Sequence, residues 1–209
     1  MNARHILRPH GRVSRVRPPT RARGFSLIIA MLMLAIIGLA SAAIMRNATS
    51  GEQVANNNRL QTQANQYAQL ALRYCMIQLS LDAPARAVPL LSASNPPAWS
   101  GYQSWSTSGG ARAAHTLSAD DIGGTVQPRV APQCLMEATA VPDVYTVTAR
   151  GFSADYQANP TSGATRNGST VWLQATVQAQ ADGGSGTAAV KGPLRVRQRL
   201  WQQLLTPPF

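Results

Sequence analysis

The residues of this chain that could carry out acid–base, nucleophilic or metal chemistry are few and scattered. His5 and His10 lie in a basic N-terminal stretch, and His115 lies in a region rich in proline and glycine. His115 has no cysteine or acidic residue at the spacing of a metal site. The sequence also contains no P-loop, dinucleotide fingerprint or nucleophile elbow. We therefore predict that the protein is not an enzyme and needs no metal or other cofactor.

The acidic pair Asp120–Asp121 is the remaining candidate for binding an ion. Calcium sites usually supply about 6–8 oxygen ligands, so two neighbouring carboxylates give a Ca²⁺ site only partial support. Ser118 precedes Asp121 by three residues, which is the pattern of a turn or a helix start. We expect this segment to form such local structure.

Cys75 and Cys134 are the two cysteines of the chain. If they lie outside the cytoplasm, where thiols are oxidised, two cysteines are expected to form a disulfide. The bond would close a loop of about 60 residues and tie an irregular region to a helix. The alternative is a pair of buried free thiols.

The net charge of +11 comes mostly from one end of the chain. Residues 1–24 contain seven arginines and no acid, whereas the other 185 residues carry 12 basic and 8 acidic side chains. A nucleic-acid-binding face would spread basic residues over a folded surface with aromatic residues between them. Here the basic residues directly precede an apolar run, which is typical of the cytoplasmic flank of a membrane span. We expect no nucleic-acid partner.

Residues 25–45 form an apolar run without a charged residue. As a helix the run would be about 31 Å long, and the hydrocarbon core of a bilayer is about 30 Å thick. We predict one transmembrane helix, with the N-terminus in the cytoplasm and the chain after Arg46 in the periplasm. Ala40-Ser41-Ala42 resembles a signal-peptidase site, but the run is longer than the ~7–15 residues usual for signal peptides.

The helix is expected to continue well beyond the membrane. No proline occurs between Thr20 and Ala83, and Asp82-Ala83-Pro84 ends the pattern, which predicts one helix over residues 25–81. An apolar stripe on its second half should pack against a C-terminal domain. The stripe consists of Leu60, Ala64, Tyr67, Ala71, Tyr74 and Leu81.

Residues 82–133 are predicted to be an irregular connection, because they contain six prolines and two glycine pairs. Trp99, Tyr102 and Trp105 lie in this connection. We expect them to pack it onto the domain, and a partner-binding patch is the alternative.

Residues 134–209 are predicted to form an antiparallel β region. Strands are expected at Val144–Phe152 and Val171–Gln178 from their β-branched content and alternation, joined as a long hairpin. Residues 194–205 fit strand and helix spacing alike, and we predict a third strand because it would stabilise the hairpin. The fold class is therefore α+β.

The string Arg23-Gly24-Phe25-Ser26-Leu27, followed by the apolar run, resembles the class III signal of type IV pilins and pseudopilins. The resemblance implies that residues 1–24 are a leader peptide. A prepilin peptidase would cut between Gly24 and Phe25 on the cytoplasmic face, and Phe25 would be N-methylated. It also implies a pilin-like fold, in which the long helix packs on a small antiparallel sheet.

Three stretches resemble more closely the PilX minor pilins, which act in pilus assembly: "MRNATSGEQVANNNRLQTQANQYAQLALR", "VYTVTARGF" and "VWLQATVQ". Major pilins carry Glu at the fifth mature position, where this chain has Ile29, and both PilX proteins and tip-forming pseudopilins often lack that Glu. The implied partners are other minor pilins, the major pilin, the prepilin peptidase, the inner-membrane assembly platform and a tip adhesin. We predict a minor pilin near the filament tip. The alternatives are a pseudopilin of type II secretion and a secreted binding domain released near Ala42.

Overall fold

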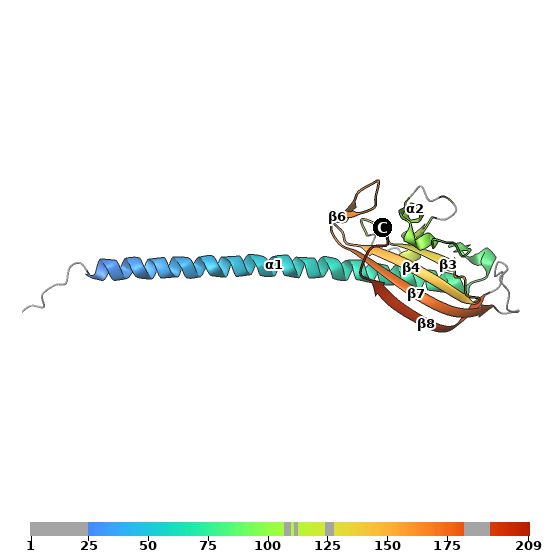
Figure 1. The fold of residues 1–209 in the computed structure, drawn as a ribbon. Coiled ribbons are helices and arrows are strands. Elements are labelled where there is room, and N and C mark those ends of the chain that lie inside the picture. Colours follow the sequence, from blue (N-terminus) through green and yellow to red (C-terminus); the bar gives the residue numbers. More distant parts are fainter. Residues whose placement is uncertain (1–24, 107–109, 111–112, 124–127, 182–192) are drawn as a thin grey trace, which may run out of the picture. The chain divides into compact units, whose positions relative to one another are not determined.

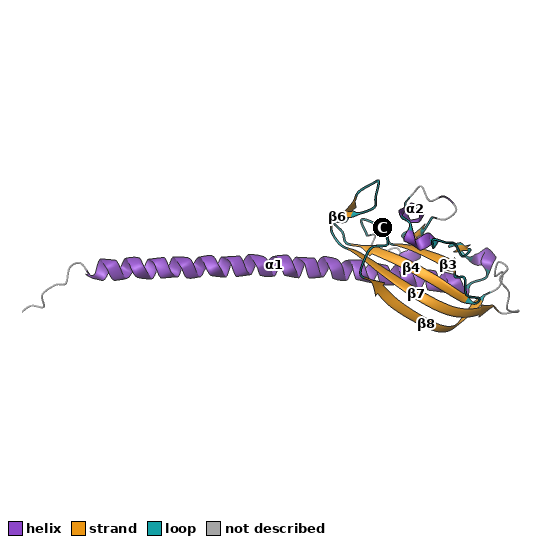
Figure 2. Cartoon of the chain, viewed as in Figure 1, coloured by secondary structure: helices purple, strands orange, loops and turns teal. Residues whose placement is uncertain are grey.

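The structure is a computed structural model that describes residues 25–106, 110, 113–123, 128–181 and 193–209. Figures 1 and 2 show a long helix followed by short elements and a twisted sheet. The elements in chain order are α1 (Phe25–Ser80), η1 (Ala83–Ala85), β1 (Leu90–Leu91), η2 (Ala98–Ser100), α2 (Tyr102–Trp105), β2 (His115–Thr116), η4 (Asp120–Ile122), β3 (Gln133–Ala138), β4 (Val144–Phe152), β5 (Gln157–Ala158), β6 (Thr165–Asn167), β7 (Thr170–Ala181) and β8 (Leu194–Leu204).

The chain divides into two compact units, Met1–Ser50 and Gly51–Phe209. The described part of the first unit is the beginning of α1. The second unit contains the rest of α1 and all the strands, and its fold is α+β as predicted. Helix α1 ends at Ser80, one residue before the predicted end.

The main sheet has the strand order β1-β3-β4-β7-β8, and β2 pairs with the same strand, β3, as β1 does. Strands β4 and β7 form the predicted hairpin, with Val144 opposite Gln178 and Phe152 opposite Thr170. Strand β8 extends it antiparallel to β7. Strands β3, β4, β7 and β8 pair antiparallel, as predicted for the C-terminal region. The sheet as a whole is mixed and not antiparallel throughout, because β1 from the connection runs parallel to β3. The 41 residues between Leu91 and Gln133 provide the crossover connection that parallel pairing requires.

The second half of α1 covers one face of the sheet. Its buried apolar residues there follow a three-to-four spacing and are mostly small: Leu60, Ala64, Ala68, Ala71, Cys75 and Leu79. Tyr67, Tyr74 and Leu81 of the predicted stripe are only half-buried. A strict seven-residue repeat drifts around a helix with 3.6 residues per turn, so the tyrosines lie at the margin of the contact face.

Helix α1 approaches the sheet closely at Gly151 of β4. A Cβ atom at Gly151 would overlap the backbone of Ala64 and Ala68. The helix and the strand therefore meet through their main chains at this point. This close approach explains why the helix residues at the contact are small and why glycine occupies the strand position.

The opposite face of the sheet is covered by the connection between α1 and β3. Trp105 is 2% exposed and packs edge-on against Trp172 of β7, with ring centroids 4.8 Å apart. Its indole Nε1 donates a hydrogen bond to the Trp99 carbonyl at 2.8 Å. The predicted packing role of these aromatic residues is therefore confirmed for Trp105.

The chain reversal after α1 is held by two side chains. Arg86 Nε donates to the Leu81 carbonyl at 2.9 Å, near the helix end, where carbonyl groups lack intrahelical partners. Gln78 Oε1 accepts a hydrogen bond from the Ala87 main-chain N–H at 2.8 Å. These two hydrogen bonds fix the first residues of the irregular connection to the end of α1.

We predict that replacing Gly151 with alanine destabilises the second unit. The new methyl group has no space between β4 and α1, and overpacking of this kind costs about 1–3 kcal/mol of unfolding free energy. Denaturant unfolding of the full chain in detergent, followed by near-ultraviolet circular dichroism, measures the change.

Gly101→Ala is the matched control, because nothing lies within 4 Å of a Cβ at Gly101 and its φ of −107° suits alanine. The control should unfold like the original protein. Equal stability of the Gly151→Ala and Gly101→Ala variants would contradict the close contact.

Candidate functional site

The four residues predicted to act in processing and assembly lie at the start of α1 or directly before it. Arg23 and Gly24 lie outside the described residues, whereas Phe25 is the first residue of α1. The side chain of Phe25 is 66% exposed and that of Ile29 is 41% exposed. The first turn of α1 contains no acidic residue, so Ile29 has no carboxylate neighbour there.

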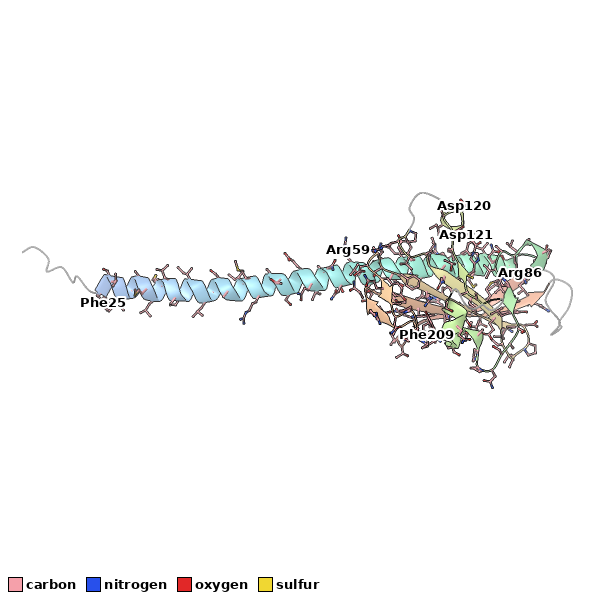
Figure 3. The ribbon with its side chains drawn as sticks, turned by 90° about the horizontal axis from the view of Figure 1, so that it is seen from above. Phe25, Arg59, Arg86, Asp120, Asp121 and Phe209 are labelled. Atoms are coloured by element: carbon pink, nitrogen blue, oxygen red, sulfur yellow. A yellow bond between two sulfur atoms is a disulfide. The ribbon has the colours of Figure 1, made fainter. Side chains whose placement is uncertain are left out.

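The apolar beginning of α1 has the properties of a membrane span. An 18-residue window has a mean hydropathy of 2.7, and none of it is buried within the protein. Figure 3 shows the side chains next to Phe25 projecting away from the helix. An apolar helical segment of this length, with its side chains exposed, is stable in lipid and unstable in water. The chain is therefore consistent with a single-pass membrane protein.

The two cysteines form a disulfide, as predicted. Cys75 of α1 and Cys134 of β3 are joined across the helix–sheet interface, with Cα atoms 6.2 Å apart, and both are fully buried. Cys134 lies within β3, a strand that was not predicted individually, and is opposite Ala149 of β4. The bond thus links α1 directly to the sheet.

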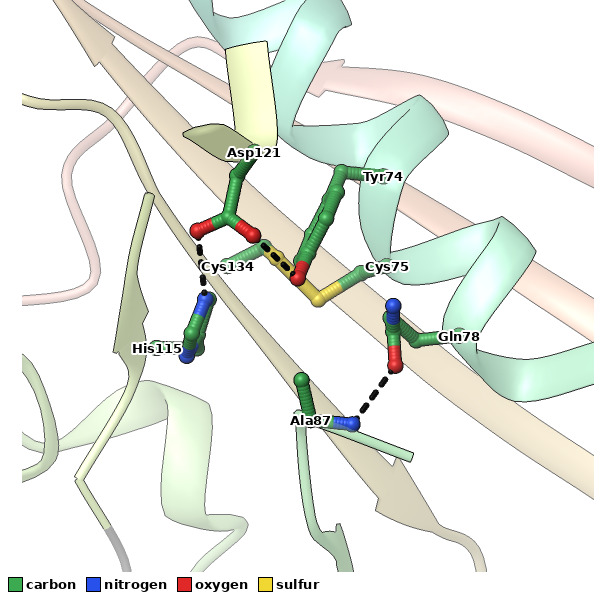
Figure 4. The surroundings of a disulfide bond; sticks show 7 residues. All are labelled: Tyr74, Cys75, Gln78, Ala87, His115, Asp121 and Cys134. Carbon is green, nitrogen blue, oxygen red and sulfur yellow. Dashed lines mark hydrogen bonds and ion pairs between the residues drawn. A yellow bond between two sulfur atoms is a disulfide. The ribbon is translucent and has the colours of Figure 1, made fainter. Parts of the chain in front are cut away.

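A polar network surrounds this disulfide (Figure 4). Tyr74 donates a hydrogen bond to Asp121 Oδ1 at 2.6 Å. His115 Nε2 lies 3.3 Å from Asp121 Oδ2, and its ring stacks on Tyr74 with centroids 5.5 Å apart. The main-chain N–H and the hydroxyl of Ser118 donate to the same oxygen, Oδ2, at 2.7 and 2.8 Å. The network connects α1, β2 and η4.

The pKa values in the network follow from these contacts. Burial and the hydrogen bond to Asp121 raise the pKa of the Tyr74 hydroxyl to about 12. Burial alone would raise the pKa of Asp121, but hydrogen bonds from Tyr74, Ser118 and His115 outweigh it and lower the pKa to about 2. At neutral pH the carboxylate is charged and accepts, and the tyrosine is neutral and donates.

These contacts revise two expectations about chemistry. His115 was expected to lack an acidic partner, but the fold brings Asp121 to it across a turn of six residues. Asp121 was a candidate calcium ligand, and its two oxygens are instead engaged by Tyr74, Ser118 and His115. Within residues that the structure describes, no three His, Cys, Asp or Glu side chains gather as a metal-binding group. The predicted turn at Ser118–Asp121 is confirmed by η4 and its reciprocal hydrogen bonds.

A second polar cluster, centred on a buried arginine, lies on the opposite face of the sheet and was not predicted. Arg150 of β4 is 6% exposed, donates to Gln133 Oε1 at 2.7 Å and donates to the Trp105 carbonyl at 2.6 Å. Its guanidinium lies 5.1–5.3 Å from the rings of Trp105, Phe152 and Trp172. Burial lowers the pKa of Arg150 to about 10, so it remains charged at neutral pH.

The signal for this cluster in the sequence is weak. Arg150 stands in a β-branched run, where an arginine usually marks the solvent side. Its burial depends on aromatic residues from Trp99 to Trp105 folding over the strand. A cation among several aromatic rings is stabilised by their π faces, and the described contacts indicate a structural role.

Comparisons of the chain with protein-family models, with curated proteins and with solved structures find no match. The resemblance to type IV pilins therefore stays a prediction that rests on the residues quoted above.

We predict that thiol alkylation of the unreduced, denatured protein labels neither Cys75 nor Cys134. Closing a loop with a sequence separation of 59 residues should stabilise the folded protein by about 4 kcal/mol in the chain-entropy treatment. Mass spectrometry after alkylation reads the number of labels, and denaturant unfolding with and without reductant reads the stability.

Full labelling after reduction is the control for access of the reagent. Comparing the reduced original protein with a Cys75→Ala/Cys134→Ala variant separates loss of the bond from loss of the sulfur atoms. Two labelled cysteines before reduction would refute the disulfide.

Proposed function

We propose that the protein is a minor pilin of the PilX kind with a structural role in type IV pilus assembly. The observation that carries the proposal is the composition of α1. One helix begins with a bare apolar segment of membrane-spanning length and ends as the packed helix of an α+β unit. This combination suits a subunit that is stored in the membrane and exposes a folded domain beside it.

The disulfide supports placing the sheet-containing unit outside the cytoplasm. Disulfides persist in the periplasm and on cell surfaces, whereas cytoplasmic thiols are kept reduced. The arginine-rich residues 1–24 would then remain on the cytoplasmic side, in agreement with the positive-inside rule.

The polar clusters support a structural role over a catalytic one. The side chains of His115, Ser118 and Asp121 are engaged with one another and with Tyr74 at the end of a turn. Arg150 is engaged with main-chain and aromatic groups. Each cluster holds elements of the fold together, as expected for a structural subunit.

The position of Ile29 supports a place at the end of the filament. In the pilin scheme, a Glu at this position pairs with the N-terminal ammonium of a neighbouring subunit. With Ile29, this chain offers its own ammonium at Phe25 to another subunit but cannot neutralise one in return. That asymmetry suits a subunit of an initiation complex at the tip, assembled with other minor pilins and few in number.

We predict that the mature protein begins at N-methylated Phe25, and that Gly24→Val blocks this processing. A residue with a Cβ hinders the close backbone access that glycine allows a peptidase. Mass spectrometry of the purified protein should find the variant heavier by its 24 leader residues.

Gly11→Val, the same substitution elsewhere in the leader, is the control and should mature normally. A mature N-terminus near Ala43 would instead establish cleavage by signal peptidase. Normal maturation of the Gly24→Val variant would refute the class III signal.

We predict that immunogold label on sheared filaments is confined to their ends, with a small ratio of this protein to the major pilin. The ratio is measured by quantitative mass spectrometry, with the major pilin labelled in parallel as the control for the shaft. Regular label along the shaft would overturn the tip position, and Ile29 would then be tolerated throughout the helix bundle.

A further inference from the structure

The second unit contains a groove of about 710 Å³ between α1 and β8. On one side it is lined by Leu72, Met76 and Ile77 of α1. Ala175 of β7 lies at its floor, and Trp201 of β8 lines the other side. Ile77 is 60% exposed and Trp201 is 64% exposed, so large apolar side chains face solvent on both sides.

The register of the sheet explains why the groove is open. Trp201 lies opposite Ala175, and Arg199 lies opposite Val177. Ala175 and Val177 are buried beneath α1, so Trp201 and Arg199 are on the same face of the sheet as α1. Helix α1 covers β3, β4 and β7 on this side and leaves the corresponding residues of β8 uncovered. Figure 1 shows β8 as the outer strand of the sheet, next to β7. A sheet face with apolar residues is normally buried against another element.

The charges around the groove are of one sign. Arg73 of α1 and Arg197 and Arg199 of β8 line it, and among the described residues no acidic side chain belongs to its lining. Arg197 donates to Gln180 Oε1, which is a neutral partner. An occupant therefore needs apolar side chains at its centre and negative charge at its margins.

The free edge of β8 is protected against pairing with another strand. The register shifts between Gln178 and Ala179, so that Arg197 has no direct partner in β7. A bulge and a row of arginines are two features by which edge strands resist further pairing. An occupant is therefore favoured on the face of the sheet beside α1, in the helical layer.

We propose that this groove binds an amphipathic, acidic helix of a partner protein. A helix with side chains is about 10–12 Å across, and it would extend the layer formed by α1 over β8. Its apolar stripe would contact Met76 and Trp201, and its flanking carboxylates would pair with Arg73 and Arg199. Helices that bind in grooves use such stripes of apolar anchors, and charge complementarity selects the partner.

A second copy of this chain fits the groove poorly. Helix α1 contains one acidic residue, Glu52, so it could not supply both acidic flanks. Pairing of β8 with β8 would bring the arginines of two copies together, which is repulsive. The partner is therefore a different protein. This inference goes beyond the proposed function and does not depend on the processing of the leader.

The test is photo-crosslinking of the full chain in the cells that produce it. A photoreactive residue replaces Ile77, and a parallel variant carries it at Leu200, which points to the opposite side of β8 and is 72% exposed. We expect the Ile77 position to crosslink one segment of a different protein, with apolar residues at helical spacing and acidic residues beside them. The Leu200 position should not crosslink that segment.

Charge reversal tests the role of the arginines. Arg73→Glu/Arg199→Glu should reduce the crosslink about tenfold or more, as expected for loss of close charge pairs. Reversal of the partner's acidic residues to lysine should restore it. Two separate exposed arginines, in Arg59→Glu/Arg166→Glu, supply a control with the same change in net charge and should leave the crosslink unchanged.

Four results would overturn the proposal. They are a crosslink to a second copy, a crosslink to a segment without acidic residues, a yield unaffected by charge reversal in the groove, and no crosslink above that of the Leu200 position. A normal mature N-terminus at Phe25 in the same samples would show that the proposed function survives such a failure.

Discussion

The main-chain contact between α1 and β4 at Gly151 determines the geometry of the second unit. Because no side chain separates the two backbones there, the helix lies as close to the sheet as packing allows. The same closeness brings Cys75 and Cys134 to a Cα separation of 6.2 Å, within the range of about 4.4–6.8 Å that a disulfide can span. Replacing the alanines of the stripe with larger residues would lift the helix and strain both contacts. The small residues of α1 are therefore as important as its large ones.

The two faces of the sheet are covered in different ways. On the α1 side, buried apolar residues from both partners form a continuous core. On the other side, two buried charged residues hold an irregular segment by its main chain. Arg150 donates to the Trp105 carbonyl, and Glu137 accepts from the Ala98 N–H and the Ser94 hydroxyl. An irregular segment has main-chain groups without regular partners, and burying them is favourable only when they are hydrogen-bonded.

The parts of the structure with local signals could be predicted from the sequence. The helix ends one residue from its predicted end, β4 matches its predicted bounds, and β8 is a strand as predicted. Strands β1 and β2 could not be predicted, because two residues carry no periodicity and their pairing depends on distant β3. The disulfide followed from a count of cysteines. The contact between His115 and Asp121 and the burial of Arg150 did not, because each requires segments that meet only in the folded chain.

The disulfide also determines how the second unit would respond to a pulling force. Cys75 lies five residues before the end of α1, and Cys134 lies in the second position of β3. Tension applied along α1 would pass through the sulfur atoms into the sheet, and the residues between the two cysteines would carry none of it. Sliding of the helix over the sheet would require breaking a covalent bond. The proline-rich segment can therefore differ in sequence and in conformation without weakening the mechanical link between helix and sheet.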